Sequence, residues 1–156
     1  MDGMKIPMKK VFDLAEELRQ NPKRVELTQA LTLNASKPNM GLKGSHGLFG
    51  SPDWWTSIEA GAMPLKRLSG IIERAYYAGQ GGTGPNNMID IVTDNGTPEA
   101  VGIYINDPLD VNLFTKGHRV EIVYALDELK QQPSPEGLVN YSKVALAMSV
   151  STQPAK

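Results

Sequence analysis

The sequence contains no cysteine, which excludes disulfide bonds, thiolate nucleophiles and zinc sites with sulfur ligands. It contains two histidines, His46 and His118, and their spacing suggests neither a catalytic pair nor a metal site. We expect His118, which follows a glycine at the start of a strand, to be exposed to solvent. No apolar run approaches the roughly 18 residues of a membrane span. Charges recur throughout residues 1–20, so we expect no signal peptide and a cytoplasmic location.

The motifs that mark common enzyme classes are also missing. H-E-x-x-H, G-x-S-x-G and EF-hand patterns do not occur. Residues 79–84, GQGGTG, match G-x-G-x-x-G, but they lead into Pro85 and another strand rather than a helix that could bind a pyrophosphate. We interpret Asp53, Asp107 and Asp127 as helix-start and loop charges. The sequence therefore predicts no cofactor, no metal and no enzyme activity, although an enzyme with an unrecognised site stays a third hypothesis.

Charge is nearly balanced overall but unevenly distributed. The formal net charge is -1, and it divides into about +3 for residues 1–78 and about -4 for residues 79–156. A dedicated nucleic-acid-binding protein usually carries a marked basic excess. The balance therefore disfavours nucleic acid as the partner and leaves a local basic patch as the alternative.

The 40% hydrophobic content and 156 residues are typical of one globular domain. We expect a single domain over residues 1–156, with an N-terminal part at 1–67 and a β-barrel at 68–152. In the N-terminal part, apolar residues three and four apart predict a helix over 8–20, and alternation predicts a half-buried strand over 24–33. A glycine-rich connector follows, and within it Ser51 and Pro52 predict the start of a short helix.

From Leu68 onward the pattern is almost entirely β. Three strand-like segments, a short helix that starts at Asp107-Pro108, and two further strands follow one another, and Asp94-Asn95-Gly96 supplies a hairpin turn. This order resembles the OB-fold, a five-stranded Greek-key barrel. The sequence predicts a mainly β, OB-like barrel with a short helix between its third and fourth strands, extended by the N-terminal helix and strand. An SH3-like barrel or a small open β-sandwich are the alternatives.

Candidate binding residues follow from that barrel. Ligands of OB-folds usually meet the exposed face of the second and third strands. Alternation places Tyr104 on the outward side of the third strand, and it places Arg74 and Tyr76 on one face of the first. Tyr76 and Tyr77 must face opposite ways, and the pattern leaves open which of them is in the core. Aromatic side chains beside an arginine suit the stacking of bases or sugars.

A second set of candidates lies around the paired tryptophans. Trp54 shares a helix face with Ile58, so we expect Trp54 to be buried and Trp55 to be more exposed. His46 and Lys43 precede them on the glycine-rich connector. The candidate site residues are Lys43, His46, Trp55, Arg74, Tyr76 and Tyr104.

These observations favour a non-enzymatic binding or protein-interaction module. Its partner would be another protein or a second copy of the same chain, and we expect no membrane partner. The alternative is a single-stranded nucleic-acid-binding protein with an OB-fold, which would use Arg74, Tyr76, Tyr104 and the basic residues between 37 and 67.

Overall fold

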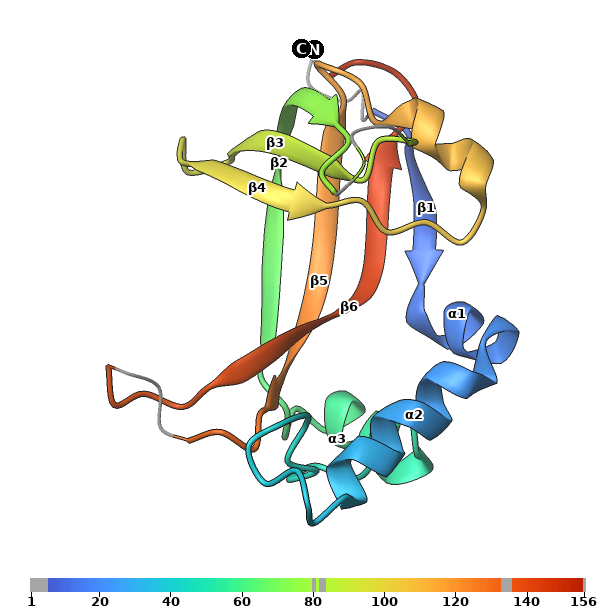
Figure 1. Ribbon diagram of the computed structural model, residues 1–156. Coiled ribbons are helices and arrows are strands. Elements are labelled where there is room, and N and C mark those ends of the chain that lie inside the picture. Colours follow the sequence, from blue (N-terminus) through green and yellow to red (C-terminus); the bar gives the residue numbers. More distant parts are fainter. Residues whose placement is uncertain (1–5, 80, 82–83, 133–135, 156) are drawn as a thin grey trace. The chain divides into compact units, whose positions relative to one another are not determined.

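Alternating apolar residues build most of the strands in the computed structural model, which describes residues 6–79, 81, 84–132 and 136–155. The chain is mainly β, as predicted. In chain order the elements are β1 (Met8–Asp13), α1 (Leu14–Gln20), α2 (Pro22–Leu33), α3 (Pro52–Glu59), β2 (Leu65–Tyr76), β3 (Met88–Thr93), β4 (Pro98–Gly102), the 3-10 helix η1 (Pro108–Leu113), β5 (Arg119–Glu128) and β6 (Tyr141–Ser151) (Figure 1). Residues 80, 82 and 83 of the glycine-rich 79–84 segment lie outside the described residues.

The strands form one open six-stranded sheet in the order β1-β6-β5-β2-β3-β4. The OB-like closed barrel is not confirmed. β1 pairs with β6 as an added strand, and β4 is an edge strand that pairs with β3 alone. The chain after β4 returns to β1 through a hydrogen bond from the Asn106 N–H to the Val11 carbonyl oxygen (2.9 Å), without forming a strand there.

The chain divides into two compact units. The first unit comprises residues 1–14, 67–123 and 146–156, and the second comprises residues 15–66 and 124–145. Side chains on one face of the strands fill the core of the first unit; they include Ile72, Ile89, Ile91, Val101, Val120, Ile122, Met148 and Val150. In the second unit, buried side chains come from helices, a loop and strand ends; they include Leu18, Leu42, Phe49, Trp54, Met63, Tyr124 and Val144.

The turn and capping signals in the sequence are confirmed. The backbone N–H of Gly96 donates to the Thr93 carbonyl oxygen (2.8 Å) in the β3–β4 hairpin, where Gly96 has a φ of 85°. The Ser51 hydroxyl caps α3 by accepting from the Trp54 N–H (3.2 Å). Asp107 caps η1 in the same way, by accepting from the Leu109 N–H at 3.0 Å.

The predicted helix over residues 8–20 is wrong in its first half. Residues 8–13 form β1, and the helix starts only at Leu14. Val11 and Phe12 are both buried, and β1 pairs with β6 from Met8 to Asp13. Backbone pairing with a strand more than 130 residues away in the sequence therefore overrides the local helical spacing.

The predicted strand over residues 24–33 is wrong throughout, because these residues belong to helix α2. Two of the apolar residues that suggested alternation, Leu27 and Leu33, are exposed. The half-buried positions include Val25, Thr28 and Thr32, which are three and four residues apart. Pro22 at the first position and the Glu, Gln, Ala and Leu residues that follow favour the helix.

Among the described residues, no helix is long and apolar enough to cross a membrane.

Candidate functional site

The structure divides the six predicted site residues into two groups. Arg74, Tyr76 and Tyr104 belong to the first unit, and we call them the strand group. Lys43, His46 and Trp55 belong to the second unit, and we call them the loop group. The sequence reasoning about the first three rested on strand alternation, and these residues do lie on or directly after β2 and β4.

Arg74 and Tyr76 share one face of β2, as predicted, and they meet Asp90 on β3. The Arg74 guanidinium lies 4.3 Å from the centre of the Tyr76 ring. Its Nε donates to Asp90 Oδ2 (2.6 Å), and the Tyr76 hydroxyl donates to Asp90 Oδ1 (3.3 Å). The hydrogen bond that Arg74 donates to Asp90 raises the pKa of the Arg74 guanidinium above its ordinary value. The three side chains therefore hold an exposed arginine in a defined position.

Tyr76 and Tyr77 are both half-buried, so neither tyrosine is fully in the core. The Tyr77 ring lies against Gly79 and Gly84, where an added Cβ would come within 3 Å of ring atoms. Tyr77 thus packs on the loop that joins β2 and β3. Tyr76 is the tyrosine that carries the contact with Arg74.

Tyr104 lies just beyond the end of β4 and is half-buried rather than freely exposed. Its ring centre is 5.7 Å from that of the buried Phe12, and its ring covers the position that a Cβ of Gly102 would take. Strand register places Gly102 opposite Met88, and Met88 opposite Tyr76. Tyr76, Met88 and Gly102 therefore form a row across β2, β3 and β4, and the Tyr104 ring lies beside the last residue of this row.

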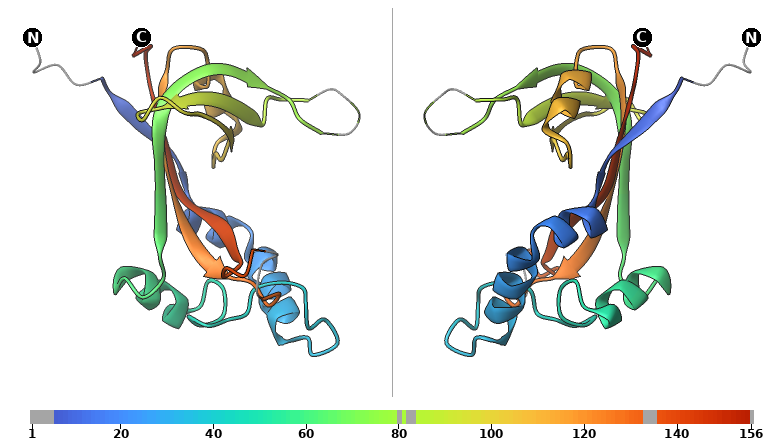
Figure 2. Two further views of the ribbon diagram at one scale, coloured as in Figure 1. Left: turned by 90° about the vertical axis from the view of Figure 1, so that its left-hand side faces the viewer. Right: turned by 90° about the vertical axis from the view of Figure 1, so that its right-hand side faces the viewer.

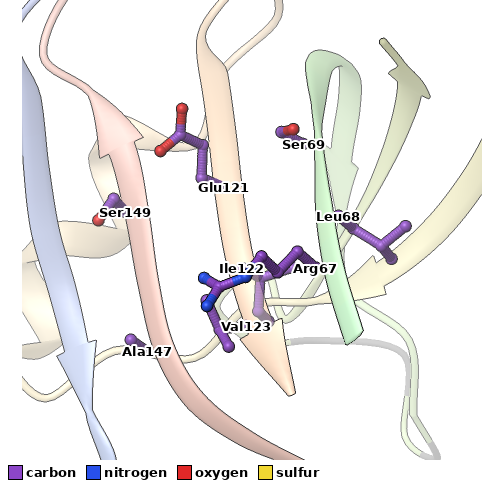
Figure 3. A pocket seen from close by; sticks show the side chains of 8 residues that line it. All are labelled: Arg67, Leu68, Ser69, Glu121, Ile122, Val123, Ala147 and Ser149. Atoms are coloured by element: carbon purple, nitrogen blue, oxygen red, sulfur yellow. The ribbon is translucent and has the colours of Figure 1, made fainter. Parts of the chain in front are cut away.

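The face of the sheet turned away from the core, which we call the outer face, is shallowly hollowed. Arg67, Ser69, Glu121, Val123, Ala147 and Ser149 are among the residues that line a hollow of about 190 Å³ over β2, β5 and β6 (Figure 3). Figure 3 shows the Arg67 side chain extending from β2 across β5, beside Val123. Pockets for drug-sized ligands usually have about 300 to 1,000 Å³, so this hollow is smaller than such a pocket.

An ion pair on the first unit joins the β3–β4 turn to β5. Both guanidinium NH2 groups of Arg119 donate to the Asp94 carboxylate, at 2.9 and 2.8 Å. The Ser69 hydroxyl also donates to Asp94 Oδ2 (3.0 Å). Chiefly because of the Arg119 hydrogen bonds, the pKa of Asp94 falls to about 2. At neutral pH this carboxylate is therefore charged, and it accepts hydrogen bonds from Arg119 and Ser69.

In the loop group, the glycine-rich connector is tied to the end of β5 (Figure 2). Leu42 and Leu129 form an antiparallel β-bridge, and the Lys43 N–H donates to the Glu128 carbonyl oxygen (2.9 Å). The Ser45 hydroxyl donates to Glu128 Oε2 (2.8 Å). Gly47 has a φ of 100°, and a Cβ there would meet the backbone nitrogen of Trp54 at 3.0 Å. Gly47 thus allows the connector backbone to lie in contact with the start of α3, where a larger residue would clash.

Trp54 is buried and Trp55 is half-buried, as predicted. The two rings meet edge to face with centres 4.9 Å apart. His46 is half-buried, and its carbonyl oxygen accepts from the Ser57 hydroxyl at 3.1 Å. Lys43 is exposed, with its Nζ 3.9 Å from Glu128 Oε2. Within the loop group, Trp55 thus packs on the buried Trp54, and Lys43 and His46 lie on the connector that precedes both rings.

Asp127 was interpreted from the sequence as a loop charge, and that interpretation is wrong. It lies in β5, is fully buried, and accepts a hydrogen bond from Trp54 Nε1 at Oδ2 (2.9 Å). Its Oδ1 has no hydrogen-bond partner among the described residues. Burial is the largest cause of a raised pKa for Asp127, and the Trp54 hydrogen bond opposes it.

His118 is buried rather than exposed, which corrects the sequence-based expectation. Its Nδ1 lies 2.7 Å from the Ser151 carbonyl oxygen, and its own carbonyl oxygen accepts from the Ile72 N–H (2.9 Å). These contacts join His118, which directly precedes β5, to β2 and β6. Within the described part of the chain, no group of three or more histidine and carboxylate residues is arranged to hold a metal ion.

Comparison with known protein families identifies a match over most of the chain. The family model described as "Immunity protein RhsI2" matches residues 8–151, a range that begins at β1 and ends with β6. No curated protein matches the chain.

Proposed function

The chain belongs to the RhsI2 family of immunity proteins, and from this premise we propose that it binds a cognate protein toxin and blocks its action without catalysis. The observation that carries the proposal is the extent of the match, from the first residue of β1 to the last of β6. The whole sheet, and not one local motif, belongs to the family. A protein-binding role follows directly from membership.

We place the toxin contact on the outer face of the first unit, around the strand group. Tyrosine and arginine are over-represented among the residues that dominate binding energy at protein interfaces. Arg74 is exposed, yet Tyr76 and Asp90 fix its position, so little side-chain entropy remains to be lost on binding. The shallow hollow over β2, β5 and β6 adds a place for a side chain of the toxin.

The charges around Arg74 favour a protein over single-stranded nucleic acid. Asp90 already neutralises Arg74, and the acidic residues Glu73 and Glu99 are among those that line the neighbouring hollow together with Asp90. A phosphate backbone would meet net negative charge there. Self-association also stays a prediction, and the molar mass of the isolated chain by light scattering tests it.

The experiment uses the toxin domain that an RhsI2 family member neutralises. This domain is produced in bacterial cells with and without the chain, and growth is followed; the purified proteins are then mixed and separated by size. Restored growth together with a stable complex supports the proposal. A toxin that stays lethal and elutes alone overturns it. A labelled oligonucleotide at two salt concentrations serves as the nucleic-acid arm, and tight, salt-sensitive binding would favour the alternative.

Variants then locate the surface. Arg74→Ala combined with Tyr76→Ala should weaken toxin binding at least about tenfold, as expected for an interface hot spot. Arg19→Ala is the matched control, because Arg19 is exposed on α1 and pairs only locally with Glu16 (2.7 Å). Equal binding by both variants would show that the toxin contacts another surface.

A further inference from the structure

The outward edge of β4 carries backbone groups that no described residue pairs. β3 and β4 are antiparallel, with Ile89 opposite Val101 and Asp90 opposite Ala100. The Ile103 N–H donates to the Asn87 carbonyl oxygen (2.9 Å), and the Thr93 N–H donates to the Thr97 carbonyl oxygen (2.9 Å). In an antiparallel ladder, alternate residues bond to the same neighbour. Because Thr97 and Ile103 face β3, the N–H and C=O groups of Ala100 and Gly102 point away from it.

At the opposite edge of the sheet, some outward-facing backbone groups of β1 do have hydrogen-bond partners. On β1, the Asp13 N–H donates to Asn106 Oδ1 (2.8 Å), and Asn106 Nδ2 donates to the Asp13 carbonyl oxygen (3.3 Å). The Val11 carbonyl oxygen accepts from the Asn106 N–H at 2.9 Å. A salt bridge between Lys9 and Asp110 (2.6 Å) lies beside these bonds. One asparagine therefore pairs the β1 edge at Val11 and Asp13, and no described residue does the same for β4.

Edge strands are often kept from pairing with another chain by a proline, by charged side chains or by a bulge. β4 has Pro98 and Glu99 at its start but no bulge, so its unprotected part is the stretch from Ala100 to Gly102. The β4 sequence is Pro-Glu-Ala-Val-Gly, its register with β3 is regular, and Pro98, Glu99 and Ala100 are exposed. Ala100 is small and exposed, so another backbone can approach it closely, whereas the Tyr104 ring lies beside Gly102.

The chemistry of the incoming segment follows from the charges beside this edge. Glu73, Asp90, Pro98, Glu99 and Ala100 line a hollow of about 280 Å³. Arg74 compensates Asp90, whereas within the described residues no ion pair involves Glu73 or Glu99. An extended segment with a lysine or arginine would therefore gain both backbone hydrogen bonds and charge complementarity.

We propose that a basic, extended segment of the toxin adds to the sheet as a strand beside β4, with its backbone on Ala100 and Gly102 and its cationic side chains at Glu73 and Glu99. This inference rests on the proposed function, because it assigns the toxin segment to a place on the same unit. It gives a role to the unpaired backbone groups of β4, whereas Asn106 pairs part of the opposite edge at Val11 and Asp13.

Amide exchange tests the pairing directly in the unmodified protein. The chain, labelled with ¹⁵N, is compared alone and in complex with the toxin domain that an RhsI2 family member neutralises. The amides of Ala100 and Gly102 should exchange at least about tenfold more slowly in the complex, because their N–H groups become bonded. The Val101 amide faces β3 in both states and should change much less. Unchanged exchange at Ala100 and Gly102 in a formed complex would overturn the strand addition and leave the proposed function intact.

Two variants test the same point by affinity. Ala100→Pro removes the outward N–H without removing a bond to β3, and it should weaken toxin binding at least about tenfold. Glu73→Lys with Glu99→Lys should weaken binding and reduce its salt dependence, and it serves as the test if the proline variant is unfolded by circular dichroism. Glu26→Lys with Glu59→Lys, on exposed helix positions, is the matched control. A native chain that binds no toxin contradicts the proposed function, whereas full binding by the edge variants contradicts only this inference.

Discussion

The strand group and the loop group are built in opposite ways. Arg74 and Tyr76 lie two residues apart on one strand, and the side chain that both contact, Asp90, lies opposite Arg74 on the next strand along the chain. In the loop group, the Lys43 N–H donates to the Glu128 carbonyl oxygen, and Trp55 packs on Trp54, whose indole donates to Asp127 more than 70 positions later. The strand group therefore takes its geometry from local strand alternation, and the loop group takes its geometry from long-range anchoring. Substitutions should disturb the second far more than the first.

Trp54→Ala should give the largest effect and disrupt the loop group. It removes a fully buried ring that packs on Phe49 (centres 5.0 Å apart) and leaves Asp127 without its indole donor. The free energy of unfolding should fall by about 3 to 5 kcal/mol, measured by urea denaturation. Trp55→Ala is the control on the neighbouring, half-buried ring, with an expected loss of about 1 kcal/mol. Equal losses would show that both rings belong to the core.

Lys130→Met should have the next largest effect, again in the second unit. The Lys130 Nζ donates to the carbonyl oxygens of Leu31 (2.5 Å), Asn34 (3.4 Å) and Lys37 (3.1 Å), at and beyond the end of α2. Its loss should lower the free energy of unfolding by about 2 kcal/mol, since these are charge-assisted bonds to helix-end carbonyls. Hydrogen exchange should quicken over residues 31–41. Lys23→Met, at an exposed lysine near the start of α2, should leave that exchange unchanged.

Asp127→Asn should act in the other direction and stabilise the protein at pH 7. Burial raises the pKa of Asp127, so the folded chain holds this proton more tightly than the unfolded chain, and native stability falls as pH rises from the ordinary aspartate pKa through the raised one. The amide has no such penalty and should add roughly 1 kcal/mol at pH 7. That gain should shrink as the pH falls toward 4. A variant that is less stable than the native chain at pH 7 would show that the Trp54 hydrogen bond to the carboxylate outweighs the cost of burying its charge.

Tyr76→Phe should have the smallest effect and mark the contrast with the loop group. It removes only the hydroxyl that donates to Asp90 over 3.3 Å and keeps the ring beneath Arg74. The free energy of unfolding should change by less than about 0.5 kcal/mol, measured under the same urea conditions. A loss above 1 kcal/mol would show that the strand group, too, has a structural role.

The sequence predicted the strand group because strand alternation is a local property. Arg74 and Tyr76 face the same way for that reason alone, and Trp54 was placed inward by its spacing from Ile58. Asp127 could not be placed, because the alternation of β5 breaks where Tyr124 and Ala125 are both buried, and this break turns Asp127 inward and Leu126 partly outward. β1 was misassigned for a similar reason, since its partner strand β6 lies more than 130 positions away in the sequence. α2 was misassigned because an apparent apolar alternation was given more weight than the helix propensity of its own residues.

The attachment of Lys130 to the end of α2 has a consequence for the order in which the chain folds. The second unit joins residues 15–66 to residues 124–145, so its first segment is synthesised well before the second. Until residue 130 has left the ribosome, the carbonyls at the end of α2 and the backbone at Gly41 and Lys43 lack their strand partners. Non-local contacts of this kind slow folding and expose unsatisfied surfaces in the meantime. We therefore expect the second unit to complete its fold late in synthesis, after the antiparallel strands β2, β3 and β4 have already paired.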